Sequence, residues 1–240
     1  PIRKTILENF ELLSVYDVSV AFEEVGLEQV IIILKNSAPL KNKIKILKNG
    51  EEINLISQSV FKEKGIILTS LDKEKYSLIT KIENNSISLS RIADMPRGVT
   101  VNSSEFKSQP SRDAVQVIGG TNLERYKIKE GNKRKPNRYL LIKDKRLLQK
   151  NNIFDIKRIV YQNIASSVPR IIATINSILP TDDTLNNMIV SDKSFTYEYI
   201  LSILNSKLMT YWFNIKFNKL QRGLFPQFKV RDFDIMRFLF

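Results

Sequence analysis

The apolar run at residues 29–34, Gln-Val-Ile-Ile-Ile-Leu, is the longest in the chain and limits the folds that the chain can adopt. A helix needs about 20 apolar residues to cross a bilayer, so this run is too short for a membrane span. Continuous apolar runs of this length are typical of strands covered on both faces in an α/β sheet. We therefore expect a buried strand in a globular protein, and no membrane partner.

Other short runs predict an α+β protein in which strands predominate. The strand signals, alternating or β-branched residues bounded by turn residues, fall at 10–20, 29–34, 44–47, 53–56, 158–164, 170–175 and 187–190. Asn49-Gly50 predicts a tight turn between the third and fourth of these runs. Residues 3–9 are typical of the end of a helix that stops at Asn9.

The segment from Tyr197 to Phe217 carries the clearest helical period. Its apolar residues recur every three or four positions, which predicts one long C-terminal helix with a single apolar stripe. The stripe residues are Ile200, Leu201, Leu204, Leu208, Tyr211, Trp212 and Ile215. Core packing is the favoured role for this aromatic-rich stripe, ahead of a platform for base stacking.

Cysteine and histidine are both absent. Their absence excludes disulfides, thiolate nucleophiles and Cys- or His-based metal sites. The absence of cysteine agrees with a reducing cytoplasm, where we expect the protein to be found. Gly119-Gly120 has no third glycine and no long helix after it, so a phosphate loop is not indicated. We read Asp182-Asp183, which precedes Thr184, as a turn. These features predict no catalytic residue, cofactor site or metal site in this chain.

Positive charge is concentrated in two blocks. Residues 101–150 hold 13 Lys and Arg against five Asp and Glu, and residues 201–240 hold seven against two. Residues 1–60 are near neutral, with seven against eight. Because each neutralised phosphate releases counterions, blocks of this kind favour a nucleic-acid partner. An anionic membrane or an acidic protein is the alternative on charge alone.

Two segments carry side chains that suit DNA. Residues 157–170 end a predicted strand with Gln, Asn, Ser and Arg, which can pair with base edges. An exposed strand end with a polar loop is an equally weighted alternative. Residues 216–227 form a basic helix end that runs into Gly223 and Pro226, which favours phosphate contacts.

Motifs between residues 87 and 227 resemble, in their order, the TaqI-like target-recognition domain found at the C-terminal end of adenine-specific DNA methyltransferases and of fused methyltransferase–restriction enzymes. The motifs are Arg97-Gly98, Ile118-Gly-Gly-Thr-Asn-Leu-Glu-Arg-Tyr126, Arg158-Ile-Val-Tyr-Gln-Asn-Ile164, Arg170-Ile-Ile-Ala-Thr174, Thr181-Asp-Asp-Thr-Leu-Asn186, Tyr199-Ile-Leu-Ser-Ile-Leu-Asn-Ser-Lys-Leu208 and Gln221-Arg-Gly-Leu-Phe-Pro-Gln227.

The resemblance implies a division of the chain into three parts. Residues 1–60 would be the C-terminal remnant of a Rossmann-like methyltransferase sheet, residues 61–86 a linker, and residues 87–240 a mixed, β-rich DNA target-recognition domain. The family's catalytic loop and methyl-donor motif lie upstream of such a segment and are absent here. We therefore expect S-adenosylmethionine in a parent enzyme and not in this chain.

The resemblance also implies partners and contacts. The partners are double-stranded DNA and a methyltransferase domain, supplied in cis or in trans, within a type II restriction–modification enzyme. The residues expected to contact DNA are Arg97, Asn122, Arg125, Gln162, Arg170, Lys207, Gln221 and Arg222.

Two other functions stay open at this point. One is a non-catalytic specificity subunit, similar to those of type I systems, which recruits separate methyltransferase and nuclease subunits. The other is a truncated fragment that acts as an interaction module. Because the first residue is Pro1, we expect the chain to be part of a longer protein. The apolar C-terminus, residues 236–240, indicates either an interface, which would allow a homodimer, or a truncated or frameshifted reading frame.

Overall fold

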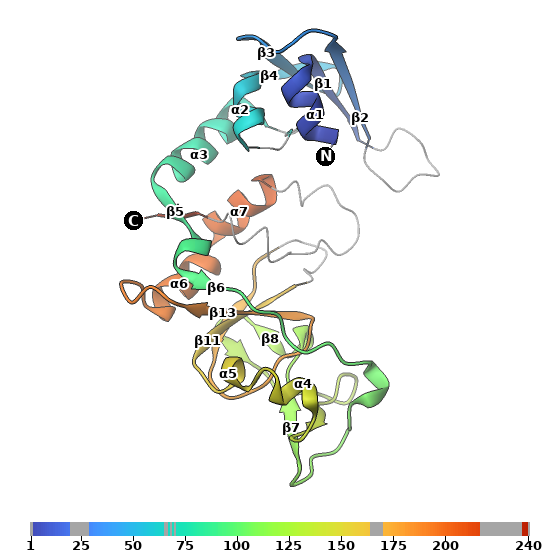
Figure 1. Ribbon diagram of the computed structural model, residues 1–240, viewed down its shortest axis with the longest axis vertical. Helices are drawn as coiled ribbons and strands as arrows, with labels where there is room; N and C mark the ends of the chain where they lie inside the picture. Colours follow the sequence, from blue (N-terminus) through green and yellow to red (C-terminus); the bar gives the residue numbers. More distant parts are fainter. Residues whose placement is uncertain are drawn as a thin grey trace. The chain divides into compact units, whose positions relative to one another are not determined.

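The computed structural model describes residues 2–19, 29–64, 67, 69, 71–163, 170–216 and 237–239. These residues form two compact units (Figure 1). Residues up to Asn84, together with Trp212 to Lys216, belong to the first unit, and the others from Asn85 belong to the second.

The described residues contain both helices and several sheets. The α-helices are α1 (Ile2–Asn9), α2 (Gln58–Lys64), α3 (Lys73–Asn84), α4 (Lys145–Leu148), α5 (Asn151–Phe154), α6 (Tyr197–Leu204) and α7 (Lys207–Lys216), and the 3-10 turns are η1 (Leu89–Arg91), η2 (Ser103–Glu105) and η3 (Gly120–Asn122). The strands are β1 (Glu11–Ser19), β2 (Gln29–Lys35), β3 (Lys43–Lys48), β4 (Glu51–Ser57), β5 (Ser86–Ser88), β6 (Ala93–Asp94), β7 (Ala114–Val117), β8 (Leu123–Glu124), β9 (Lys127–Ile128), β10 (Arg138–Leu141), β11 (Arg158–Gln162), β12 (Ala173–Asn176), β13 (Leu185–Val190) and β14 (Arg237–Leu239). The predicted mixture of helices and strands is confirmed.

The first unit is built on a four-stranded sheet of order β2-β1-β3-β4. β1 runs antiparallel to β2 and parallel to β3, and β3 and β4 form a hairpin. The hairpin turn has φ of 51° at Asn49 and 84° at Gly50, so both turn residues adopt the left-handed conformation that an Asn-Gly turn favours. The predicted turn is therefore confirmed. Leu12, Val15 and Ile44 are fully buried in this unit.

Strand β2 corrects one expectation. The run predicted to be buried on both faces lies at the edge of the sheet, where β1 is its paired strand. Val30, Ile31, Ile33 and Leu34 are between 39% and 53% exposed. The prediction of a strand is confirmed, but the prediction of burial is wrong, because no layer of described residues covers this strand.

The segment expected to be an irregular linker, residues 61–86, contains the end of α2, all of α3 and the start of β5. α3 directs Ile79 and Ile82 into the interior. The change from the first unit to the second follows Asn84, directly after α3.

The predicted long C-terminal helix is two helices, α6 and α7, and this expectation is wrong. The side chain of Asn205 is buried between them and pairs with the backbone of Ala173: its Oδ1 accepts from the Ala173 N–H at 3.0 Å, and its Nδ2 donates to the Ala173 carbonyl at 2.9 Å. Ser206 Oγ then accepts from the Met209 N–H at 3.0 Å and caps α7. The break between the helices also divides the stripe, because Leu208 is exposed whereas Met209 is buried.

The second unit contains an antiparallel four-stranded sheet of order β12-β11-β13-β6. Its strands β11, β12 and β13 are the three predicted between residues 158 and 190, with slightly different ends. A core of this unit gathers Ile118, Leu123, Val160, Ile172 and Leu185.

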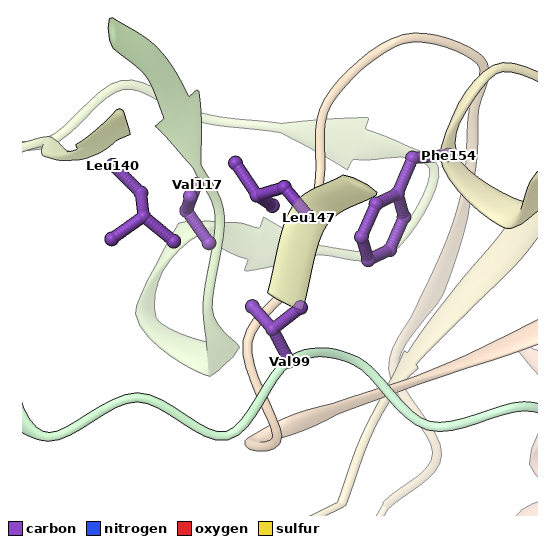
Figure 2. Packing of buried hydrophobic residues seen from close by; sticks show 5 residues of the cluster. All are labelled: Val99, Val117, Leu140, Leu147 and Phe154. Carbon is purple, nitrogen blue, oxygen red and sulfur yellow. The ribbon is translucent and has the colours of Figure 1, made fainter. Parts of the chain in front are cut away.

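A second core lies beside the antiparallel pair β7 and β10. Figure 2 shows its five side chains directed toward one another, with Leu147 from α4 and Phe154 from α5 meeting Val117 and Leu140 of the strands, and Val99 closing the group. By packing against β7 and β10, these two short helices stabilise the strand that begins with Arg138.

Arg158, the first residue of β11, is completely buried. Its guanidinium donates to the carbonyls of Phe154, Ile156 and Leu179 and to Oδ1 of Asn187, at 2.5 to 3.1 Å. Burial lowers the pKa of Arg158 to about 10, so the group is still charged at pH 7. This arginine is a structural cross-link between segments.

None of the helices in the described ranges is long and apolar enough to span a membrane.

Candidate functional site

The second unit contains an open cleft of about 970 Å³. Four regions of sequence meet there, namely the turn η3 with the β8–β9 hairpin, the residues before and at the start of β10, the end of β11 with residues 170–172, and the turn at 182–184. The lining residues are Gly120, Thr121, Leu123, Glu124, Arg125, Lys129, Lys135, Pro136, Arg138, Gln162, Arg170, Ile172, Asp182 and Thr184.

The cleft has a net charge of +3, because five cationic side chains line it against two carboxylates. Lys129 pairs with Glu124 at 3.0 Å, and its hydrogen bond holds the pKa of that carboxyl below the usual value. Arg138 pairs with Asp182. In the part of the chain that the structure describes, the other three, Arg125, Lys135 and Arg170, form no ion pair.

The floor of the cleft is the Gly119-Gly120 turn. The N–H of Gly119 donates to Oδ1 of Asn122 at 3.1 Å, and the N–H of Gly120 donates to Oγ1 of Thr184 at 2.8 Å. The Gly120 carbonyl accepts from Nε2 of Gln162 at 2.7 Å. The double glycine therefore joins strand β11 to the turn at 182–184, and it is a structural floor, not a phosphate loop.

Asp182 is the residue around which this floor is organised. Its side chain is 4% exposed, and its Oδ1 accepts from both the N–H and Oγ1 of Thr184, at 3.0 and 2.5 Å. Its other oxygen accepts from Nη2 of Arg138. The reading of Asp182 and Asp183 as a turn is confirmed, since Asp183 and Thr184 form the turn before β13.

Three of the predicted DNA-contacting residues line the cleft together. Arg125 is held by hydrogen bonds from Nε to the Ile171 carbonyl at 3.1 Å and from Nη2 to Oγ1 of Thr210 at 3.5 Å. Gln162 lies at the end of β11, and Arg170 is exposed. The fold therefore brings Arg125 and Arg170, which are 45 positions apart in sequence, to the same cleft.

Three others lie outside the cleft lining. Asn122 is 5% exposed, and its Nδ2 donates to the Lys129 carbonyl, so its amide is used within the turn. Arg97 and Lys207 are exposed but are not lining residues. The remaining two, Gln221 and Arg222, fall outside the described residues.

The Arg97-Gly98 motif has a packing role. A Cβ on Gly98 would lie 2.1 Å from the Asp182 carbonyl oxygen, so a side chain would prevent this close approach of two backbone segments. Nζ of Lys150 donates to the carbonyls of Arg97 and Gly98 at 2.6 and 2.9 Å, and burial lowers its pKa. Lys150 therefore fixes the backbone of residues 97 and 98 by two hydrogen bonds.

Sequence reasoning missed Lys129, Lys135, Arg138 and Thr184 as cleft residues. The basic block at 101–150 contained the first three, but charge count could not separate them from its other ten cations. Asp182 and Thr184 were visible only as a turn, because their hydrogen-bond partners are more than 40 residues away.

Comparison with protein families gives one match: the model of the TaqI-like C-terminal specificity domain fits residues 115–235, which include every residue of the cleft. No curated protein matches the chain.

Among solved structures, the type IIG restriction endonuclease BpuSI aligns with a TM-score of 0.48 and 13% identity over 99% of this chain. The type IIL restriction-modification enzyme MmeI, solved in complex with DNA, aligns with a TM-score of 0.48 and 9% identity over 97% of this chain. The present chain spans 38% and 37% of the lengths of those two proteins.

Proposed function

The chain belongs to the family of TaqI-like C-terminal specificity domains, and on that premise we propose that its second unit binds double-stranded DNA and reads its sequence. The observation that carries the proposal is the cleft, where Arg125, Gln162 and Arg170 converge in a net positive environment. All three were expected to contact DNA from sequence alone.

The cleft offers the two kinds of contact that DNA recognition requires. Phosphate contacts position a protein on the duplex and need exposed cations, which Lys135 and Arg170 provide at the cleft. Base contacts need donors and acceptors in fixed positions. Gln162 meets this requirement, because its amide is anchored to the Gly120 carbonyl at the floor of the cleft.

We extend the proposal to a parent enzyme: a restriction–modification protein with adenine-specific DNA methyltransferase activity. In it, residues 1–60 would complete a Rossmann-like methyltransferase sheet. The exposed apolar side chains of β2 support this view, because an apolar edge strand calls for a covering layer. S-adenosylmethionine would supply the methyl group in the parent, while the residues described here would bind and position the DNA.

The test is duplex binding by the whole chain, measured by fluorescence anisotropy at several salt concentrations. Arg170→Glu should weaken binding roughly tenfold and lower the slope of log affinity against log salt by about one, because a phosphate contact is lost. Arg112→Glu is the matched control. Arg112 is exposed and belongs to the same basic block, but it does not line the cleft. Equal losses in the two variants would refute a role for the cleft and leave only nonspecific attraction.

A further inference from the structure

Arg138 differs from the other cations of the cleft because its guanidinium is fixed on several sides. Nη2 donates to Oδ2 of Asp182 at 2.5 Å, and the carbon of the guanidinium lies 4.6 Å from the centre of the Phe106 ring. The residue begins β10, where its backbone pairs with Val117. Its side chain nevertheless remains 32% exposed and lines the cleft.

Asp182 is itself immobilised, so it can hold the arginine in one orientation. Its carboxylate is nearly fully buried, and the oxygen that does not meet Arg138 is occupied by two hydrogen bonds from Thr184. Asp182 also bonds through its backbone, with its N–H donating to the Ile118 carbonyl at 3.0 Å. The carboxylate therefore cannot follow a moving guanidinium.

Gly119 supplies the space in which this pair lies. A Cβ at Gly119 would be 2.2 Å from Nη2 of Arg138 and 2.6 Å from Oδ2 of Asp182. No side chain fits at this position without displacing the pair. Glycine is therefore needed at position 119 because a side chain there would displace Arg138 from Asp182.

An arginine held in this way suits a neutral acceptor better than a phosphate. The adjacent carboxylate offsets its charge, which weakens long-range attraction to phosphate. Most of its hydrogen-bond donors remain available to a ligand. The guanidinium carries five N–H groups, and among the described residues only Nη2 has an acceptor. A fixed, planar pair of donors matches O6 and N7 of guanine, which accept a bidentate arginine.

We propose that Arg138 reads a guanine in the DNA target and that Asp182 is the positioning residue that orients it. This inference rests on the proposed function, since it presupposes a DNA-binding cleft. It assigns base reading to Arg138 and leaves phosphate binding to the exposed cations.

The first experiment selects bound duplexes from a pool of random sequence, using the whole chain and its variants. The wild-type protein should enrich guanine at one position at least, and Arg138→Lys should reduce that preference about 5- to 100-fold, because a flexible ammonium lacks the fixed planar fork of donors and the contact with Asp182 that orients it. Arg146→Lys is the matched control. Arg146 is also clamped by carboxylates, those of Asp144 and Glu105, but it does not line the cleft.

Asp182→Asn separates positioning from simple structural damage. Without the carboxylate, Arg138 gains net charge and freedom, so guanine discrimination should fall while affinity for unrelated DNA rises and its salt dependence becomes steeper by about one phosphate. Damage to the fold would instead lower every affinity together. Thermal unfolding of each variant shows whether it is folded.

A change in the DNA provides a test that does not depend on any variant folding. Replacing the selected guanine with 7-deazaguanine removes the N7 acceptor and should weaken wild-type binding about 5-fold or more, and should weaken binding by Arg138→Lys less than this. If wild-type binding is unchanged by 7-deazaguanine, or if Arg138→Lys loses affinity for all sequences equally, Arg138 is not a base reader, although the cleft still binds DNA. If the wild-type chain binds no duplex at any salt concentration, the proposed function fails and this inference fails with it.

Discussion

Asn205, which separates α6 from α7, offers a sharp test of how the second unit is held together. In Asn205→Ala, the Ala173 N–H loses its partner in a buried position, and the Ala173 carbonyl keeps only its bond from the Tyr126 N–H at 3.1 Å. An unsatisfied buried donor and a second lost bond together cost about 2 to 3 kcal/mol. The higher helix propensity of alanine returns about 0.5 kcal/mol.

The expected net loss is therefore about 2 kcal/mol of unfolding free energy. For a chain of this size, such a loss lowers the melting temperature by roughly 4 to 8 °C. The measurement is thermal unfolding followed by circular dichroism, with Ser202→Ala as the control on the exposed face of α6. Ser202→Ala should change the melting temperature by less than about 2 °C.

A melting temperature for Asn205→Ala equal to or above that of the wild type would refute this reasoning. That result would mean that α6 and α7 join into one continuous helix without loss. The single long helix suggested by the apolar spacing would then be an accessible structure, and the bond to Ala173 would not be what separates the two helices.

Three further predictions follow from buried or exposed groups. Arg158→Met should lower the unfolding free energy by about 3 kcal/mol, measured by urea denaturation, because four hydrogen bonds from a completely buried side chain are lost; an unchanged midpoint would contradict the role of the cross-link. Hydrogen bonds from Arg146 hold the pKa of Asp144 below its usual 3.8, so this carboxylate contributes stability above about pH 4 that is lost as the pH falls through the lower, folded-state pKa. Asp144→Asn should therefore be less stable than wild type at pH 7, by up to about 1 kcal/mol, and the gap in melting temperature should narrow as the pH is lowered below 3.8; a gap that does not change with pH would contradict this. Finally, Ile31→Lys with Ile33→Lys should leave the melting temperature of this chain within about 2 °C of wild type, but should destabilise the parent enzyme in which β2 is covered; equal effects in both would count against a covering layer.

The sequence predicts the strands of this protein better than it predicts their surroundings. The run at 29–34 and residues 158–162 are strands because β-branched residues favour an extended backbone wherever the strand lies. Whether a strand is covered depends on what packs against it, and the run at 29–34 could not reveal that it lies at an edge. Likewise, the period of the C-terminal segment identified helices, but the break at Asn205 depends on Ala173, 32 residues earlier.

The candidate site was predictable in part for the same reason. Arg125, Gln162 and Arg170 were chosen because their side chains suit DNA, and the fold places all three at one cleft. Arg138 and Asp182 look ordinary in sequence, since neither has a neighbour that suggests a pair 44 residues apart. Asn122 is instead buried with its amide bonded inside the turn, as polar side chains in turns often are.

The residues of the cleft differ in whether they can be replaced without loss of the fold. Its floor, made by Gly119, Asp182 and Thr184, is tied into the unit by buried hydrogen bonds, and substitution there disturbs the architecture. Lys135 and Arg170, by contrast, stand on exposed turns and segments, where replacement leaves the core intact. On the proposed function, the strength of DNA binding can therefore change through substitution of exposed cations without loss of the fold, whereas a change in the base read by Arg138 must also preserve the floor that holds it.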